Sequence, residues 1–188
     1  MIPDEDFYKV PEVPGPSKEE VRCLVMCHSR VKEGDVVLEV GCGTGGLTVE
    51  LSRRAAKVYS VDKNPQALEV TLTNLRKLNP QGEVELILGD ALEAMEDLPP
   101  YDLLVVGGSS GELEEIIRKA YQQLQAGGRV VVTAILLETR LRSLKVMEDL
   151  EMEPRIVEVF VARGRTTQMG TMMQGLNPVA IISGVKKL

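Results

Sequence analysis

The sequence predicts an α/β fold, in which helices cover both faces of a seven-stranded, mostly parallel sheet. From residue 36 to residue 150, apolar strand-like segments alternate with amphipathic helical segments, a rhythm typical of parallel strands joined by crossover helices. A glycine-rich turn, GCGTGG, follows the first of these strands. The last two strand-like segments have no helical segment between them, and such strands are most easily antiparallel. We therefore expect one domain over residues 1–188, with a C-terminal antiparallel hairpin.

The N-terminal segment is expected to be extended before the first helix begins. Residues 1–16 contain four prolines, which disfavour a helix. The sequence SKEE at 17–20 matches a capping box, in which the Ser17 hydroxyl accepts a hydrogen bond from the backbone amide of Glu20. This pattern predicts a helix from there to about residue 29.

Five segments are expected as parallel strands, and the near-continuous apolar character of the third and fourth indicates burial on both faces. They are VVLEV (36–40), KVYSV (57–61), VELIL (84–88), DLLVV (102–106) and RVVVTAIL (129–136). The final pair, RIVEVFVA (155–162) and PVAIISGV (178–185), is expected to form the antiparallel hairpin.

Helices are expected between these strands. A short one follows the glycine turn to about residue 54. Asn64 as a cap and Pro65 at the first helical position begin the next helix. Its expected buried stripe is Leu68, Leu72 and Leu75. A later helix ends at the glycines of AGGR, and another covers about 138–150. The buried positions expected in the helix before AGGR are Leu113, Ile116, Ile117, Ala120 and Leu124.

Composition limits the classes of partner. The formal net charge is −6 and aromatic residues are 3% of the chain, which argues against binding nucleic acid through phosphate contacts or base stacking. No apolar run approaches the roughly 20 residues of a membrane helix, and the acidic, proline-rich N-terminus is unlike a targeting peptide. We expect a cytoplasmic protein with no metal site, whose Cys23 and Cys27 are reduced and packed as small apolar groups.

The glycine turn alone leaves two ligands open. Gly41, Gly43 and Gly46 match the dinucleotide pattern G-x-G-x-x-G, whereas Glu39, Gly41, Gly43 and Gly45 match the E-x-G-x-G-x-G pattern of methyltransferases. Both ligands need a sharp turn whose bare backbone the ligand can approach.

Acidic residues at three successive strand ends favour S-adenosylmethionine. Glu39 would repel a pyrophosphate but suits a ligand that carries an ammonium and a sulfonium group. Asp62 can accept hydrogen bonds from both ribose hydroxyls, and Asp90 beside the backbone of Ala91 can bind the adenine edge. The alternative is that Asp62 and Asp90 only cap the segments that follow. We predict S-adenosylmethionine as cofactor and S-adenosylhomocysteine as its product.

The segment after the fourth strand, GGSSGE, indicates the kind of methyl acceptor. Enzymes that methylate exocyclic amines resemble one another in carrying Asn/Asp-Pro-Pro-Tyr/Phe at this point, which this chain lacks. Gly107 and Gly108 instead leave open space beside the methyl donor. This arrangement favours a bulky acceptor that is methylated at carbon or oxygen.

Several motifs then resemble one family over essentially the whole chain. IPDEDF, VPGPSKEEVR, VGCGTGG, VVGGSSGEL, VTAILLET, ARGR, GTMM and NPVA resemble the decarboxylating cobalt-precorrin methyltransferases of anaerobic cobalamin biosynthesis. The resemblance implies a Rossmann-like class I methyltransferase fold, a homotetramer, and a reaction that methylates carbon 15 of the macrocycle and removes carbon dioxide from the ring-C acetate. It also implies cofactor contacts at Ser17, at Gly41, Cys42, Gly43, Thr44 and Gly45, at Asp62 and at Ala91.

A polyanionic tetrapyrrole requires cations from an acidic protein. Arg163 and Arg165, in ARGR before a glycine- and methionine-rich loop, are predicted to clamp its carboxylates, because arginine offers a bidentate fork. The alternative is that both form structural ion pairs while the loop packs on a neighbouring subunit. Glu112 and Glu138 are candidates for proton transfer, or are simply acids at helix starts that interact with the helix dipole.

Three other functions remain open from the sequence. The chain could methylate RNA or protein, which a basic groove would favour. It could bind S-adenosylmethionine without catalysis, or it could be a nicotinamide-dependent oxidoreductase.

Overall fold

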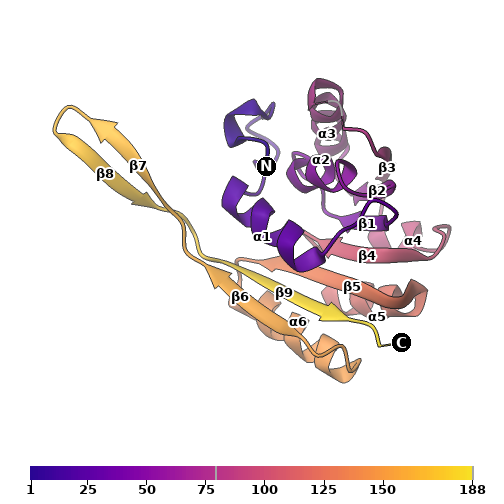
Figure 1. Cartoon of the computed structure of the whole chain (residues 1–188). Helices are drawn as coiled ribbons and strands as arrows, with labels where there is room; N and C mark the ends of the chain where they lie inside the picture. Colours follow the sequence, from indigo (N-terminus) through magenta and orange to yellow (C-terminus); the bar gives the residue numbers. More distant parts are fainter. Residues whose placement is uncertain (79, 188) are drawn as a thin grey trace.

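A computed structural model describes residues 1–78 and 80–187 and contains the expected seven-stranded sheet, in the order β3-β2-β1-β4-β5-β9-β6 (Figure 1). Strands β1 to β5 are parallel, and β9 is antiparallel to both β5 and β6. This confirms the mostly parallel sheet and its antiparallel end. The strands of this sheet are β1 (Val36–Val40), β2 (Lys57–Asp62), β3 (Glu83–Leu88), β4 (Tyr101–Val106), β5 (Leu124–Ala134), β6 (Arg155–Val159) and β9 (Val179–Val185).

Helices cover both faces of the sheet, with α1 to α3 on one side and α4 to α6 on the other (Figure 1). Alternation along the buried strands creates these two cores. Val37 and Leu103 pack with α1 and α2, whereas Leu38 and Leu104 pack with α5 and α6. The helices are α1 (Glu19–Ser29), α2 (Gly46–Ser52), α3 (Pro65–Leu78), α4 (Ala91–Ala94), α5 (Leu113–Gln123) and α6 (Leu137–Asp149).

Two strands that the sequence did not predict form a separate ribbon. The segment expected as a loop is a hairpin of β7 (Ala162–Thr167) and β8 (Gly170–Gly175), and Figure 1 shows it projecting away from the sheet. Met169 is fully exposed, and Met172 and Met173 are more than half exposed. A two-stranded ribbon in water is at best marginally stable alone.

Several local expectations are wrong. Lys18, not Ser17, is the N-cap of α1, and no side chain forms a capping hydrogen bond there. The Glu20 carboxylate pairs with Arg163. The exposed thiols of Cys23 and Cys27 are free but are not packed in the core.

The apolar patterns of α3, α5 and β3 also differ in part from expectation. The buried face of α3 contains Ala67 and Val70, while Leu72 is 40% exposed. β3 lies at the sheet edge and is not buried on both faces. α5 ends before the AGG glycines, which belong to β5. All five apolar positions expected in this helix are buried, although the last, Leu124, is the first residue of β5.

The proline-rich arm is held against α2 and α3. A 3-10 turn, η1 (Asp4–Asp6), interrupts its extended course. The amide of Ile2 donates to the carboxylate of Glu50 on α2 at 2.6 Å, and the amide of Tyr8 donates to Asn74 on α3 at 2.7 Å. The arm is therefore an integral part of the helix layer.

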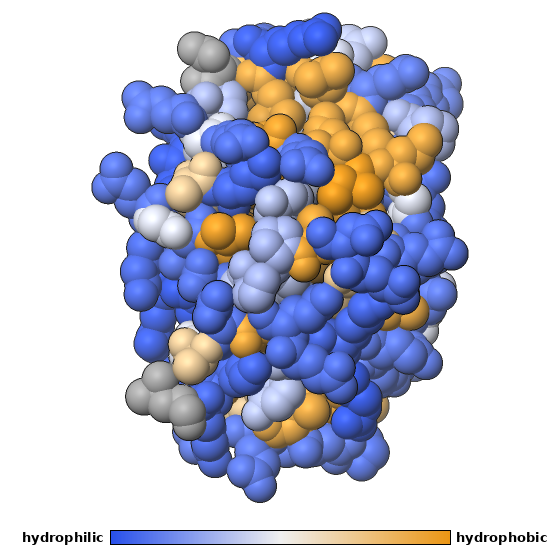
Figure 2. All heavy atoms as spheres, turned by 90° about the vertical axis from the view of Figure 1, so that its right-hand side faces the viewer, coloured by the Kyte–Doolittle hydropathy of each residue, from blue (hydrophilic) through white to orange (hydrophobic). Residues whose placement is uncertain are grey.

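The face turned away from the ribbon is mostly hydrophilic. Figure 2 shows this face, with apolar side chains gathered in one area of its upper part. Within residues 1–78 and 80–187, no helix is long and apolar enough to cross a membrane.

Candidate active site

Two adjoining cavities open at the carboxyl edge of the parallel strands. The first, of about 330 Å³, lies over the ends of β1 and β2, and the second, of about 900 Å³, lies over β5 and the start of α6. They share Pro14 and the loop from Gly107 to Ser110 as lining. A ligand in the first cavity would therefore lie directly beside one in the second.

Close backbone packing explains two of the glycines between β1 and β4. Gly41 has φ +80°, and a Cβ there would lie 2.6 Å from the backbone nitrogen of Gly108. A Cβ on Gly107 would lie 2.9 Å from the carbonyl oxygen of Gly41. A Cβ on Gly108 would meet nothing within 4 Å. The open space predicted at this loop is thus beside Gly108, whereas Gly107 is required by the packing.

Asp62 faces the first cavity from the end of β2. Its carboxylate accepts from the amide of Gly43 at 3.0 Å and from the amide of Asn64 at 2.9 Å. These bonds fix the carboxylate between the glycine turn and the start of α3, and carboxylate oxygens can accept further bonds from a ligand. Asn64 caps α3 as predicted, accepting from the amide of Gln66 at 3.0 Å.

Glu39 lies beneath the glycine turn and lines neither cavity. It is 1% exposed and accepts hydrogen bonds from Thr48 at 2.6 Å and Ser60 at 2.7 Å. Burial raises the pKa of this carboxyl to about 7. A carboxyl that is substantially protonated near neutrality does not supply the full negative charge that the sequence argument placed beside the ligand. Its direct contacts support the turn.

Asp90 caps α4 and lies outside the lining of the first cavity. Its carboxylate accepts from the amides of Leu92 at 2.7 Å and Glu93 at 3.2 Å. Lys63 lies 2.7 Å from it, and this contact lowers the pKa of Asp90. The capping alternative therefore describes the observed contacts of Asp90. Its chain neighbour Ala91 does line the cavity.

Three other predicted cofactor residues shape the turn from behind. The Thr44 hydroxyl donates to the carbonyl of Pro14, which ties the arm to the turn. The buried Cys42 thiol donates to Asp62 at 3.7 Å, and burial raises its pKa to about 12. Gly45 has φ +81°, and a Cβ there would lie 2.8 Å from the Thr71 side chain. None of the three lines the first cavity.

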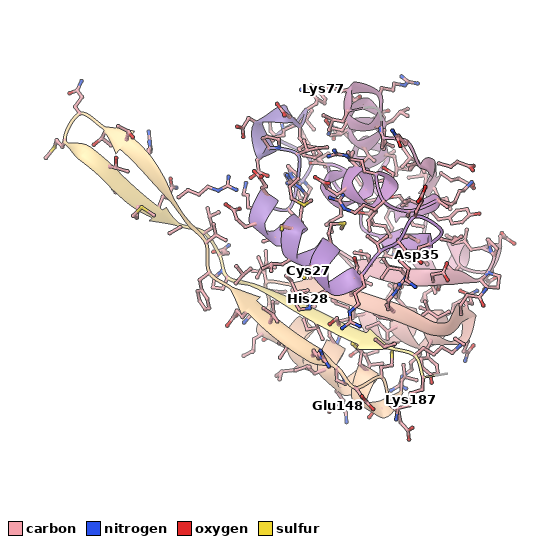
Figure 3. The ribbon with its side chains drawn as sticks, viewed as in Figure 1. Cys27, His28, Asp35, Lys77, Glu148 and Lys187 are labelled. Carbon is pink, nitrogen blue, oxygen red and sulfur yellow. The ribbon has the colours of Figure 1, made fainter. Side chains whose placement is uncertain are left out.

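The two proton-transfer candidates lie at different cavities. Glu112 lines the first, where its carboxylate is 2.9 Å from the ammonium of Lys63. Glu138 lines the second, in the first turn of α6. Ser17, expected at the cofactor, also lines the second. His28, the single histidine, lies at the end of α1 beside Cys27 (Figure 3) and lines neither of these two cavities.

The predicted arginine clamp is not assembled at either cavity. Arg163, at the base of the ribbon, is 2.9 Å from Asp4 of the arm and 2.6 Å from Glu20 of α1. Burial acts to raise the pKa of Asp4, but hydrogen bonds from Arg22 and Arg163 outweigh it, so the pKa is lowered. Arg165 lies on β7, and neither arginine lines these cavities. Arg163 therefore forms the structural ion pairs of the alternative hypothesis.

Sequence reasoning missed several residues that line these cavities, among them Pro14, Lys63 and Lys18. Pro14 reaches both because the arm folds back over the glycine turn. Lys63 follows Asp62 at the carboxyl edge, a position that its strand assignment already implied. Lys18 lines the second cavity from the start of α1. It was missed because the segment SKEE was assigned only a capping role. Across residues 1–78 and 80–187, no group of three or more His, Cys, Asp or Glu side chains is placed to bind a metal ion.

Comparison with known proteins identifies relatives over nearly the whole chain. A family model described as a precorrin methyltransferase domain matches residues 16–186. A protein of Methanothermobacter thermautotrophicus named probable cobalt-precorrin-6B C(15)-methyltransferase (decarboxylating) is 49% identical over 97% of this chain and 95% of its own length. A protein of the same name from Methanobrevibacter smithii is 43% identical over the full length of both.

Solved structures agree with this assignment. The crystal structure of precorrin 8W decarboxylase from Methanobacterium thermoautotrophicum has a TM-score of 0.95 at 48% identity and covers 98% of this chain and 99% of that one. Precorrin-6y C5,15-methyltransferase from Geobacter metallireducens has a TM-score of 0.91 at 29% identity, covering 99% and 98%. A tRNA methyltransferase from Aquifex aeolicus, at 17% identity and a TM-score of 0.77, covers 98% and 76% and shares the fold. The chain belongs to the precorrin methyltransferase domain family.

Proposed function

We propose that this protein is an S-adenosylmethionine-dependent C-methyltransferase that acts on a cobalt-precorrin of the 6B type. It methylates carbon 15 and removes carbon dioxide from the ring-C acetate, within the biosynthesis of cobalamin. The observation that carries the proposal is the pair of adjoining cavities, joined at Gly107 and Gly108, in a chain of this family. The names of the relatives that are 49% and 43% identical support the choice of substrate.

The first cavity fits the cofactor. Its volume of about 330 Å³ lies in the range of small-molecule sites, and the Asp62 carboxylate provides acceptors suited to ribose hydroxyls. Gly41, Gly43 and Ala91 present backbone or a small side chain to the ligand. The other predicted cofactor residues, Ser17, Glu39, Cys42, Thr44, Gly45 and Asp90, are proposed to act through the shape of the turn or of the neighbouring cavity.

The second cavity fits a large, flat acceptor. Its volume of about 900 Å³ is near the upper end of typical ligand sites. Apolar residues at the end of β5, Ile135 and Leu136, line it together with Gly107 and Gly108. The absent side chain at Gly108 leaves room for the acceptor to approach the first cavity.

The chemistry asks mainly for positioning from the protein. S-adenosylmethionine supplies an electrophilic methyl group, and an electron-rich carbon of a reduced tetrapyrrole needs no strong base to attack it. Holding two reactants in one geometry removes a large entropic part of the barrier. In decarboxylation, the electron pair of the broken carbon–carbon bond passes into the conjugated macrocycle, and the remaining methylene carbon then takes up a proton and becomes a methyl group. We assign any proton transfer at the substrate to Glu138, which lines the second cavity, whereas Glu112 holds Lys63 beside the first.

We propose that the chain assembles as a homotetramer, with the ribbon as an interface between subunits. The residues of the ribbon are exposed on both strands and include Met169, Met172 and Met173. Exposed apolar groups on a projecting ribbon are typical of an interaction surface. We also propose that residues 1–188 act as one domain, with no nucleic acid or membrane as partner. A cytoplasmic location is supported by three free thiols, because disulfides are rare in reducing compartments.

The test is an anaerobic incubation of the protein with cobalt-precorrin-6B and methyl-labelled S-adenosylmethionine, followed by mass spectrometry. We expect the gain of one labelled methyl group and the loss of one carbon dioxide per macrocycle. A methyl gain without carbon dioxide loss would contradict the decarboxylating role. S-adenosylhomocysteine binding without any methyl gain would favour the non-catalytic subunit.

A further inference from the structure

We propose that Lys18 binds a carboxylate of the macrocycle that is retained in the product and thereby orients the substrate in the second cavity. This assignment rests on the proposed function, since it assumes a polycarboxylate substrate. It replaces the clamp that the sequence placed at Arg163 and Arg165.

Only two cationic side chains line the second cavity among the residues that the structure describes, Lys18 and Arg142. Arg142 is already occupied. Its guanidinium donates to both carboxylate oxygens of Glu114, and it donates to the carbonyl of Gly111 at 2.6 Å. Hydrogen bonding to Arg142 lowers the pKa of Glu114, which keeps the pair ionised. Arg142 therefore braces the loop between the two cavities and has little capacity left for a substrate carboxylate.

The ammonium of Lys18 has no ion pair or hydrogen bond to any side chain or backbone group within residues 1–78 and 80–187. Its backbone, in contrast, is firmly held. The carbonyl of Lys18 accepts from the amide of Arg22 at 2.8 Å. The guanidinium of Arg22 is fully buried, donates to the carbonyl of Ser17 and is paired with Asp4 at 2.7 Å. A free ammonium on a fixed backbone is a suitable anchor for an incoming carboxylate, because little backbone entropy is lost on binding.

The charges that line the cavity are unequal on its two sides. Lys18 precedes α1 on one face of the sheet, and Glu138 lies in the first turn of α6 on the other (Figure 1). A polycarboxylate is attracted to the Lys18 side and repelled from the Glu138 side. Beside Glu138, the exposed apolar residues Ile135 and Leu136 continue the lining.

This polarity suits a reaction that destroys one carboxylate and keeps the others. An ion pair with an ammonium stabilises a carboxylate but not the uncharged carbon dioxide that leaves, so pairing the reacting acetate with Lys18 would slow its loss. An apolar surface beside a like charge has the opposite effect, since it destabilises the charged reactant. Lys18 is therefore assigned to a carboxylate that remains, and the reacting acetate to the side of Ile135 and Leu136.

The experiment compares Lys18→Met with Lys9→Met in the full-length protein. Lys9 is an exposed lysine of the same arm that lines neither cavity, so it controls for the loss of one charge. We expect Lys18→Met to raise the KM for cobalt-precorrin roughly tenfold or more, the effect of losing one charge-assisted bond. The dissociation constant of S-adenosylhomocysteine, measured by calorimetry, stays unchanged, and one carbon dioxide is still lost per methyl gained.

Two further readouts separate an anchor from a structural role. The KM of the wild-type protein rises with salt, and this dependence becomes weaker in Lys18→Met but not in Lys9→Met, because salt screens exposed charge pairs. Lys18→Arg restores most of the affinity. Wild-type turnover with an unchanged KM in Lys18→Met would overturn the Lys18 assignment alone. Absence of wild-type turnover would overturn the proposed function, and the assignment with it.

Discussion

At the scale of single residues, acids that look alike in the sequence perform different tasks in the structure. Glu39, Asp62 and Asp90 all lie at or just beyond the carboxyl ends of β1, β2 and β3, at the edge predicted from the strand pattern. Asp62 lines the cavity, Glu39 supports the turn from below, and Asp90 caps a helix. Sequence spacing places a residue at an edge, but its side-chain direction depends on contacts with Thr48, Ser60 or Lys63 that come from elsewhere in the chain.

The burial of Glu39 makes folding stability depend on pH. The pKa of Glu39 in the folded protein, about 7, lies above the ordinary value of 4.5. The protonated Glu39 carboxyl therefore contributes fully to folding stability below about pH 4.5, and this contribution is lost as the pH rises through 7. The loss corresponds to about 3 kcal/mol of unfolding free energy. We expect Glu39→Gln, which resembles the protonated form, to match the wild type near pH 4.5 and to be more stable above pH 7.

Urea unfolding at pH 4.5, 6 and 8 measures this difference. Glu33→Gln, at an exposed position, is the matched control and is expected to follow the wild type throughout. A Glu39→Gln difference that is the same at all three pH values would contradict the raised pKa.

At the scale of elements, the strands and helices that their own apolar pattern determines were predicted correctly. Features that depend on which other segment packs against an element were not. The strands from β1 to β5 and the face of α5 follow from apolar runs and helical periodicity. The ribbon could not be predicted in this way, because ARGRTT and GTMMQG have no continuous apolar face and pair only with each other. The buried stripe of α3 differs from the leucine spacing because the arm and the glycine turn pack on Ala67, Val70 and Asn74.

The base of the ribbon holds the N-terminal arm. Arg163 contacts Asp4 and Glu20, but its side chain is 40% exposed, so we attribute only about 1 kcal/mol to these pairs. We expect Arg163→Ala to increase the rate of trypsin cleavage after Lys9 about fivefold through local opening of the arm. Arg165→Ala, on the exposed ribbon, should leave that rate unchanged.

Substrate kinetics of the same variants distinguish this tether from the clamp. If Arg163 only holds the arm, the effect of Arg163→Ala on the KM for cobalt-precorrin disappears at saturating S-adenosylmethionine, because the bound cofactor holds the arm through Pro14. A large KM increase in both Arg163→Ala and Arg165→Ala, with normal proteolysis, would restore the clamp hypothesis.

At the scale of the whole molecule, the topology class was predictable but the cavities were not. The alternation of strands and helices, with an antiparallel end, is enough to place Asp62 and Gly107 on one edge. The second cavity combines the arm, the β4 loop, the end of β5 and the segment before β9, which are far apart in the chain. This combination depends on where the arm runs in the folded protein. The prolines of the arm predict an extended backbone but not its position.

Removal of the ribbon tests the proposed assembly. We expect that replacing residues 164–173 with a short glycine-containing turn, which keeps Arg163 and its contacts with the arm, converts a tetramer into smaller species, as measured by light scattering during size-exclusion chromatography. The replacement removes the exposed methionines that are proposed as interface contacts. Binding of S-adenosylhomocysteine should persist, because the ribbon does not line the first cavity. A tetramer that survives this replacement would place the interface elsewhere.

The position of β9 has a consequence for how the chain matures during synthesis. β9 follows all other strands in the sequence but lies inside the sheet, between β5 and β6, with Ala180, Ile181 and Ile182 fully buried. While a ribosome is still translating residues before 179, β5 has an unpaired edge and β6 has no neighbour. An unpaired edge of this kind favours aggregation. The nascent chain therefore completes its sheet only after residue 185 has left the exit tunnel, and slow translation of the ribbon would lengthen that vulnerable interval.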